Sequence, residues 1–308
     1  MLRSAVIFSL ACLLAAAVCT AASGYVLPAP FVAGQMQKHL NLPDQMEITQ
    51  QLHVYPDEAD GKSQGAERLG KTSADPEKVS DPEASGPASF SQTVRYSRPG
   101  AYRSDINAPD FSQIYIESSG SQLFVLDGKI LEDSRQWYAC YKDLFMFSSR
   151  PPLVRHLEQL GVDMNISSLG RLNKKTVYVA GAGYPDLSRA QVWFDKNTFL
   201  PVRWIVAPAK KTGQQPAFEI RYLDWQRFDD RIRYPGKIEF YENGRLARAV
   251  TVEKLDRISG VPASDFDIST VRKKYQSASE VPENRGGAAE EVRRQIEEFK
   301  KIYETPTQ

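Results

Sequence analysis

The sequence lacks a charge excess of either sign and lacks the common catalytic motifs. Lys and Arg number 39 and Asp and Glu 38, so the formal net charge is +1, and no electrostatic footprint for nucleic acid is present. No phosphate-binding loop, Gly-x-Ser-x-Gly or His-Glu-x-x-His motif occurs. Histidine is also scarce, and none of the three has a metal-ligand spacing: His39, His53 and His156. We therefore expect no catalytic residue, metal, cofactor or nucleic-acid partner.

Cysteine is equally scarce, and most of it lies near the N-terminus, at Cys12 and Cys19. Residues 1–23 combine an arginine, an apolar run and small residues, the pattern of a cleavable signal peptide. The run of roughly 14 apolar residues is shorter than the roughly 20 needed to span a bilayer. A retained anchor and lipidation of Cys19 are the alternatives. Cleavage would leave Cys140 alone, without a disulfide partner within the chain.

The mature chain divides by composition. Residues 24–55 predict an N-terminal helix over 31–42 and a first strand over 47–55. Residues 56–87 are rich in charged and small residues and predict a disordered insertion. Structure should resume over residues 88–268, and residues 269–308 predict a flexible segment and a C-terminal helix around Val292 and Phe299.

Period-2 alternation dominates the region after the insertion. Residues 188–206 read as a hairpin with a polar turn, and Pro201 should open its second strand. Asn243-Gly244 between two β-like runs predicts another hairpin. Four short strands in 89–126, followed by strands in 175–180 and 217–225, complete an antiparallel sheet, and residues 153–160 predict a helix. Residues 141–147 fit a strand or a helical crossing. The fold class is α+β.

The strands carry many large apolar side chains, which suit an ordinary core or an apolar cavity within a partly closed sheet. Trp193 competes with Val192 and Phe194 for the interior position. Gly181-Ala182-Gly183 follows a strand but predicts a turn, because the proline after it does not suit a phosphate-binding helix.

Three ordered patterns carry a family resemblance. They are Arg98-Pro99-Gly100-Ala101-Tyr102-Arg103, then residues 122–129 (QLFVLDGK), then Val192-Trp193-Phe194-Asp195 leading to Leu200-Pro201-Val202-Arg203. In this order, over residues 30 to 256, the chain resembles the LolA-like family of periplasmic lipoprotein-sorting proteins. The insertion and the extension past residue 256 depart from that family's pattern.

The resemblance implies a half-barrel: a curved antiparallel sheet with helices over its concave face, enclosing an apolar cavity. It implies a periplasmic, non-enzymatic, chaperone-like carrier of lipoprotein acyl chains or other lipids. The expected partners are an inner-membrane release complex and an outer-membrane receptor. An envelope sensor or protein-interaction module on the same fold is the alternative. Arg103 is expected to contact the helical lid or to lie on the strand surface. The expected cavity residues are Tyr102, Ile114, Ile116, Phe124, Phe194, Trp204, Phe218, Ile220, Tyr222 and Phe240.

Overall fold

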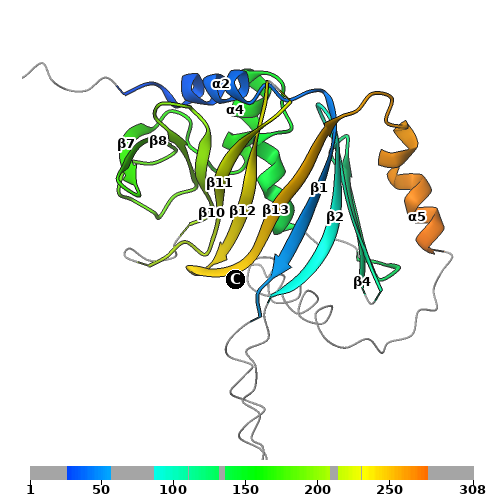
Figure 1. Cartoon of the computed structure of the whole chain (residues 1–308). Coiled ribbons are helices and arrows are strands. Elements are labelled where there is room, and N and C mark those ends of the chain that lie inside the picture. The colour runs from blue at the N-terminus through cyan, green and yellow to red at the C-terminus, as the bar shows by residue number, and fades with distance from the viewer. Residues whose placement is uncertain are drawn as a thin grey trace, which may run out of the picture.

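The protein is described here from a computed structural model, which covers residues 26–56, 87–109, 111–131, 136–208, 214–229 and 231–276. Its centre is one antiparallel sheet of 13 strands that curves without closing into a barrel (Figure 1). The strands are β1 Gln45–Val54, β2 Ala88–Ser97, β3 Ala101–Ala108, β4 Phe111–Ser118, β5 Ser121–Leu126, β6 Lys129–Ile130, β7 Ser167–Leu172, β8 Lys175–Ala180, β9 Gln191–Asp195, β10 Pro201–Ala207, β11 Phe218–Phe228, β12 Ile232–Glu242 and β13 Arg245–Arg257.

Helices cover both sides of this sheet. On the concave side lie α2 (Ala29–Leu40), the 3-10 helix η1 (Trp137–Leu144) and α4 (Arg150–Gln159) (Figure 1). On the convex side, the 3-10 helix η2 (Ala263–Phe266) and α5 (Ile268–Gln276) pack beside β3 to β6. The predicted α+β half-barrel with helices over its concave face is confirmed.

The strand order is sequential except at one place, where β1 lies between β2 and β13. β1 pairs with β2 along its whole length, from Gln45 opposite Ser97 to Val54 opposite Ala88. The chain between these strands therefore leaves and re-enters the sheet at neighbouring strand ends. This explains how an insertion can follow the first strand without disturbing the sheet. Most of the predicted insertion, and the predicted helix around Phe299, lie outside the described residues.

Most local predictions match the structure. The hairpin of residues 188–206 is β9 and β10, and Pro201 opens the second strand as expected. The segment at 141–147, for which a strand and a helical crossing were both open, is helical up to Leu144, where it belongs to the 3-10 helix η1. The sequence reading did not predict β7 or the short helix α5.

Alternation along the strands assigns side chains to the two faces of the sheet. Val192 and Phe194 belong to the large hydrophobic cluster on the concave face, whereas Trp193 packs with Val177 and Val179 on the other face. The question that the sequence left open at β9 is thereby settled by the tertiary structure.

The turn after β8 requires glycine at position 181. Gly181 has φ +107°, and a Cβ there would lie 2.6 Å from the Ala190 carbonyl oxygen. Replacing Gly181 by alanine should lower the free energy of unfolding by about 2 kcal/mol, because it combines a strained φ with a backbone clash. Urea denaturation measures this. Gly183→Ala is the matched control, since nothing lies within 4 Å of its Cβ position and its φ needs no glycine. Equal losses in the two variants would contradict the argument.

Among the described residues, the helices are all too short or too polar to cross a bilayer.

Candidate functional site

The concave face gathers most of the predicted cavity residues into one hydrophobic cluster. Their side chains are almost completely buried, and they come from β3, β5 and β9 to β12. The members are Tyr102, Phe124, Phe194, Trp204, Phe218, Ile220, Tyr222 and Phe240.

The two isoleucines of β4 do not join them. Ile116 is buried in a second cluster with Val271 of α5, and Ile114 packs against this cluster. The neighbouring residue Tyr115 points to the concave side instead. The prediction assigned β4 the wrong inward face, and a shift of one residue moves every side chain of a strand to the opposite face.

The concave face is filled by the chain itself. Tyr138 of η1 meets the Phe218 and Phe240 rings with centroids 5.5 and 5.6 Å away. Phe145, just after η1, meets Tyr222 at 5.7 Å. The cavity left beside η1 has a volume of about 30 Å³, enough for about one water and far below the roughly 300–1,000 Å³ of ligand pockets. The expected open apolar cavity is therefore closed in this structure, with η1 in its place.

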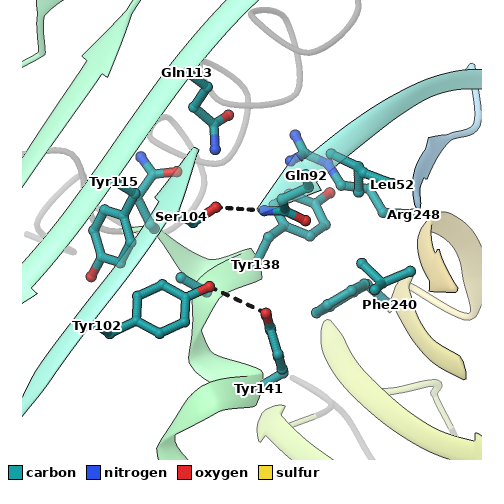
Figure 2. A pocket seen from close by; sticks show the side chains of 13 residues that line it. Leu52, Gln92, Tyr102, Ser104, Gln113, Tyr115, Tyr138, Tyr141, Phe240 and Arg248 are labelled. Atoms are coloured by element: carbon teal, nitrogen blue, oxygen red, sulfur yellow. Dashed lines mark hydrogen bonds between the residues drawn. The ribbon is translucent and has the colours of Figure 1, made fainter. Parts of the chain in front are cut away.

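The small cavity beside η1 is lined by both polar and apolar groups (Figure 2). A hydrogen-bonded chain crosses the strands, from Gln50 Nε2 to Gln92 Oε1 (2.7 Å) and from Gln92 Nε2 to Ser104 Oγ (2.6 Å). The Tyr141 hydroxyl of η1 lies 3.4 Å from Gln50 Nε2 and 3.2 Å from the Tyr102 hydroxyl. Burial raises the pKa of Tyr102 and Tyr141, so both hydroxyls stay protonated and can donate.

Two amide oxygens at this place have no hydrogen-bond partner among the described residues: Gln50 Oε1 and Gln113 Oε1. A buried acceptor without a donor costs about 1–3 kcal/mol. The polar chain is thus not fully satisfied by the protein. We call Gln50, Gln92, Ser104 and Gln113 the polar row.

A cluster of charged groups, formed by Lys142, Asp143, Glu117 and His156, connects η1 to its neighbours. Lys142 Nζ lies 2.6 Å from Asp143 Oδ1 and 2.7 Å from Glu117 Oε2, and its side chain is 4% exposed. His156 of α4 lies 3.3 Å from Asp143 Oδ2. Burial alone would raise the pKa of Asp143, but Lys142 and His156 together hold that pKa below its ordinary value. The cluster joins η1 to β4 and α4.

The arginine that contacts the concave-side helices is not the predicted one. Arg103 pairs with Asp105 and donates to the Asp265 carbonyl of η2 on the convex side (2.9 Å). Arg98 instead donates to the carbonyls of Leu42, beyond α2 (2.7 Å), and Phe147, beyond η1. Both arginines belong to the same sequence pattern, but Arg98 lies in the turn after β2 and Arg103 lies on β3.

A larger cleft opens where β10 and β11 diverge. Their pairing is limited to the stretch in which Arg203 opposes Arg221 and Ala207 opposes Phe218. Beyond Arg203 the cleft has a volume of about 740 Å³, within the range of ligand pockets. Its apolar lining consists of Leu172, Val177, Leu200, Val202, Tyr222, Leu223 and Trp225.

Both arginines that line the cleft, Arg203 and Arg221, are paired with Glu219. Arg203 Nε donates to Glu219 Oε2 (2.8 Å) and Arg221 Nε to Glu219 Oε1 (2.7 Å). The Arg203 guanidinium also lies 4.8 Å from the centre of the Trp193 ring. This pairing neutralises the two arginines, and Lys175, Asp195, Asp224 and Glu239 also line the cleft beside its apolar residues.

The sequence reading found Tyr222 but missed the cleft itself and its residues Leu200, Leu223 and Trp225. One signal pointed there, because Pro201 has no N–H to donate and so suits a strand end that does not pair on both sides. Among the described residues, no group of three or more His, Cys, Asp or Glu side chains could hold a metal ion.

Neither family models nor curated proteins match this sequence. Solved structures do match. One is provisionally described as an outer membrane lipoprotein-sorting protein domain from Vibrio parahaemolyticus, with TM-score 0.47, 8% identity, and coverage of 79% of this chain and 97% of that chain. A LolA superfamily protein from Nitrosomonas europaea matches with TM-score 0.49, 8% identity, and coverage of 79% and 99%.

A DUF1329 family protein from Desulfovibrio piger matches with TM-score 0.45, 11% identity, and coverage of 79% and 97%. At these sequence identities, the matches concern the fold alone.

Proposed function

We propose that this protein binds one acyl chain of a lipid or lipoprotein in the cleft between β10 and β11 and carries it between membranes without catalysis. The observation that carries the proposal is the preformed cleft of about 740 Å³ with its apolar lining. Exposing a chain of ~15 methylenes to water costs roughly 12 kcal/mol of free energy, at ~0.8 kcal/mol per methylene. A carrier must therefore shield the chain in an apolar cleft.

The cleft also borders the aromatic interior. Tyr222 and Trp225 line it, and both rings meet Phe145, at 5.7 and 6.5 Å between centroids. An acyl chain in the cleft therefore approaches the segment that fills the concave face. Movement of Phe145 and η1 would extend the binding surface along the sheet.

η1 suits this movement better than an α-helix would. It is a 3-10 helix of 8 residues, whereas runs longer than three or four residues are uncommon in this geometry. Its movement would have to break the polar and charged contacts of Tyr141, Lys142 and Asp143.

The periplasmic location and the inner- and outer-membrane partners belong to the proposal as well. They rest on the signal-peptide pattern and on the family resemblance of the sequence motifs. The alternative, an interaction module, would use the insertion or the C-terminal segment, which both lie largely outside the described residues.

The test is binding of a neutral acyl ligand, monopalmitoylglycerol, measured by displacement of the apolar dye N-phenylnaphthylamine. Leu223 lines the cleft, so Leu223→Glu should weaken binding at least tenfold by placing a charge against the chain. Leu246→Glu is the matched control, because Leu246 is similarly half-buried but outside the cleft lining.

Failure of the wild-type protein to take up the ligand would sink the acyl-binding proposal and favour the interaction module. Equal binding by wild type and Leu223→Glu would move the site away from the cleft.

A further inference from the structure

The polar row crosses the middle of the concave face, where a simple hydrophobic core would have aliphatic side chains. Gln50 of β1 stands directly opposite Gln92 of β2. Ser104 of β3 continues the chain through its 2.6 Å contact with Gln92. Gln50 is completely buried, and Gln92, Ser104 and Gln113 are each at most 9% exposed. Burying such groups is costly unless every one is hydrogen-bonded.

The row is not saturated by the protein. Gln50 Oε1 and Gln113 Oε1 are both acceptors without a donor among the described residues, and Gln113 lines the small cavity of about 30 Å³. Acceptors require O–H or N–H donors. A group that satisfied them would have to bring such donors into an otherwise apolar interior.

One hydroxyl already lies at the end of this row. Tyr141 OH of η1 is 3.4 Å from Gln50 Nε2 and 3.2 Å from Tyr102 OH, as Figure 2 shows for the latter. It reaches the row from the segment that occupies the concave face, with an aromatic ring behind it that meets Phe240 at 5.8 Å. An acylated molecule resembles the Tyr141 side chain in this respect, because its linkage also joins a polar group to an apolar part.

We propose that the polar row binds the donor-bearing linkage of the acyl ligand, an acylglycerol or N-acyl group, and that Tyr141 OH, which accepts from Gln50 Nε2, lies beside this position in the free protein. This inference rests on the proposed acyl-chain binding and adds the class of ligand. An acyl chain ending in hydroxyls or an amide N–H satisfies the row when η1 moves. An alkyl ester without donors leaves Gln50 Oε1 and Gln113 Oε1 unpaired and should be rejected.

The experiment compares two ligands with the same acyl chain, monopalmitoylglycerol and methyl palmitate, by dye displacement. We expect the wild-type protein to prefer monopalmitoylglycerol at least tenfold. Gln113→Leu should reduce this preference to threefold or less while methyl palmitate binds as before. Gln92→Leu is a second variant with the same expected result, so that one misfolded protein does not decide the outcome.

Two further variants separate the row from general destabilisation. Gln51→Leu is the matched control, because Gln51 follows Gln50 on β1 and so points to the opposite face; its ligand preference should equal that of the wild type. Tyr141→Phe removes the resident hydroxyl and should raise the affinity for monopalmitoylglycerol about threefold.

The failures of the two proposals have different signatures. Binding of both ligands with equal affinity, or a preference unchanged in Gln113→Leu and Gln92→Leu, would overturn the role of the polar row and leave acyl binding standing. Binding of neither ligand by the wild-type protein would overturn both.

Discussion

Replacing Lys142 by methionine is expected to lower the free energy of unfolding by about 3–5 kcal/mol at neutral pH, the usual cost of removing one partner of a buried ion pair. Lys142 Nζ lies 2.6 Å from Asp143 Oδ1, and both side chains are buried. Methionine fills a similar volume but leaves the Asp143 carboxylate without its cation. His156, 3.3 Å from Asp143, remains as a weaker partner.

The loss should depend on pH in a defined direction. In the wild type, burial raises the pKa of Asp143, but Lys142 and His156 together lower it, so the pKa lies below its ordinary value. Such a group contributes stability above its unfolded pKa of about 3.9, and this contribution is lost as the pH falls through the folded pKa. Without Lys142 the pKa of Asp143 should rise. As the pH falls, the Asp143 carboxyl of the variant therefore takes up a proton, and the variant's loss of unfolding free energy becomes smaller. The difference between wild type and variant should therefore narrow between pH 7 and about pH 4.

Urea denaturation at several pH values measures both effects. Lys254→Met is the matched control, because Lys254 pairs with Asp256 at 2.8 Å on the surface, with its side chain 68% exposed. Surface pairs of this kind contribute about 0–1 kcal/mol. A Lys142→Met loss as small as that of Lys254→Met, or one that stays constant with pH, would show that the cluster does not anchor η1.

Replacing Arg98 by methionine is expected to lower the free energy of unfolding by roughly 3 kcal/mol and to loosen the segment around η1. Arg98 Nη1 donates to the carbonyls of Leu42 (2.7 Å) and Pro43 (3.2 Å), and Nη2 donates to that of Phe147. Each buried carbonyl left unpaired costs about 1–3 kcal/mol. Burial lowers the pKa of Arg98, which is consistent with a guanidinium held inside the structure.

Hydrogen exchange locates the effect of this change. Amides of residues 137–149 should exchange faster in Arg98→Met, since Phe147 loses its tie to β2. Arg103→Met is the comparison, because Arg103 contacts Asp105 and the Asp265 carbonyl; its faster exchange should be confined to η2 and α5. The opposite distribution would restore Arg103 as the residue that holds the concave-side helices.

Local patterns were sufficient for much of the fold. Alternation and turn chemistry located β9, β10, β12 and β13, because Asn243-Gly244 and Pro201 have strong backbone requirements. The inward face of β4 was not predictable in this way. Ile114, Tyr115 and Ile116 are all apolar enough for either face, and α5 covers the convex side there.

The sequence patterns also did not predict the cleft between β10 and β11. It exists because β10 and β11 stop pairing beyond Arg203 and Arg221, and the one local signal of this divergence, Pro201 without an N–H, does not predict a cleft by itself. The same holds for η1, in which Tyr141, Lys142 and Asp143 are consecutive in the chain but reach different partners on β1, β3, β4 and α4.

By itself, the sequence determined that this protein is an antiparallel α+β protein with many aromatic residues on its strands, since side-chain period and turn residues act over a few neighbouring positions; the half-barrel was implied by the family resemblance. Only the tertiary structure decided that η1 closes this face, that Arg98 rather than Arg103 holds the covering segments, and that the open space lies between β10 and β11. These features depend on contacts between residues distant in the chain, such as Arg98 with Phe147 and Phe145 with Tyr222. Packing of the whole chain sets such contacts, and local preference does not encode them.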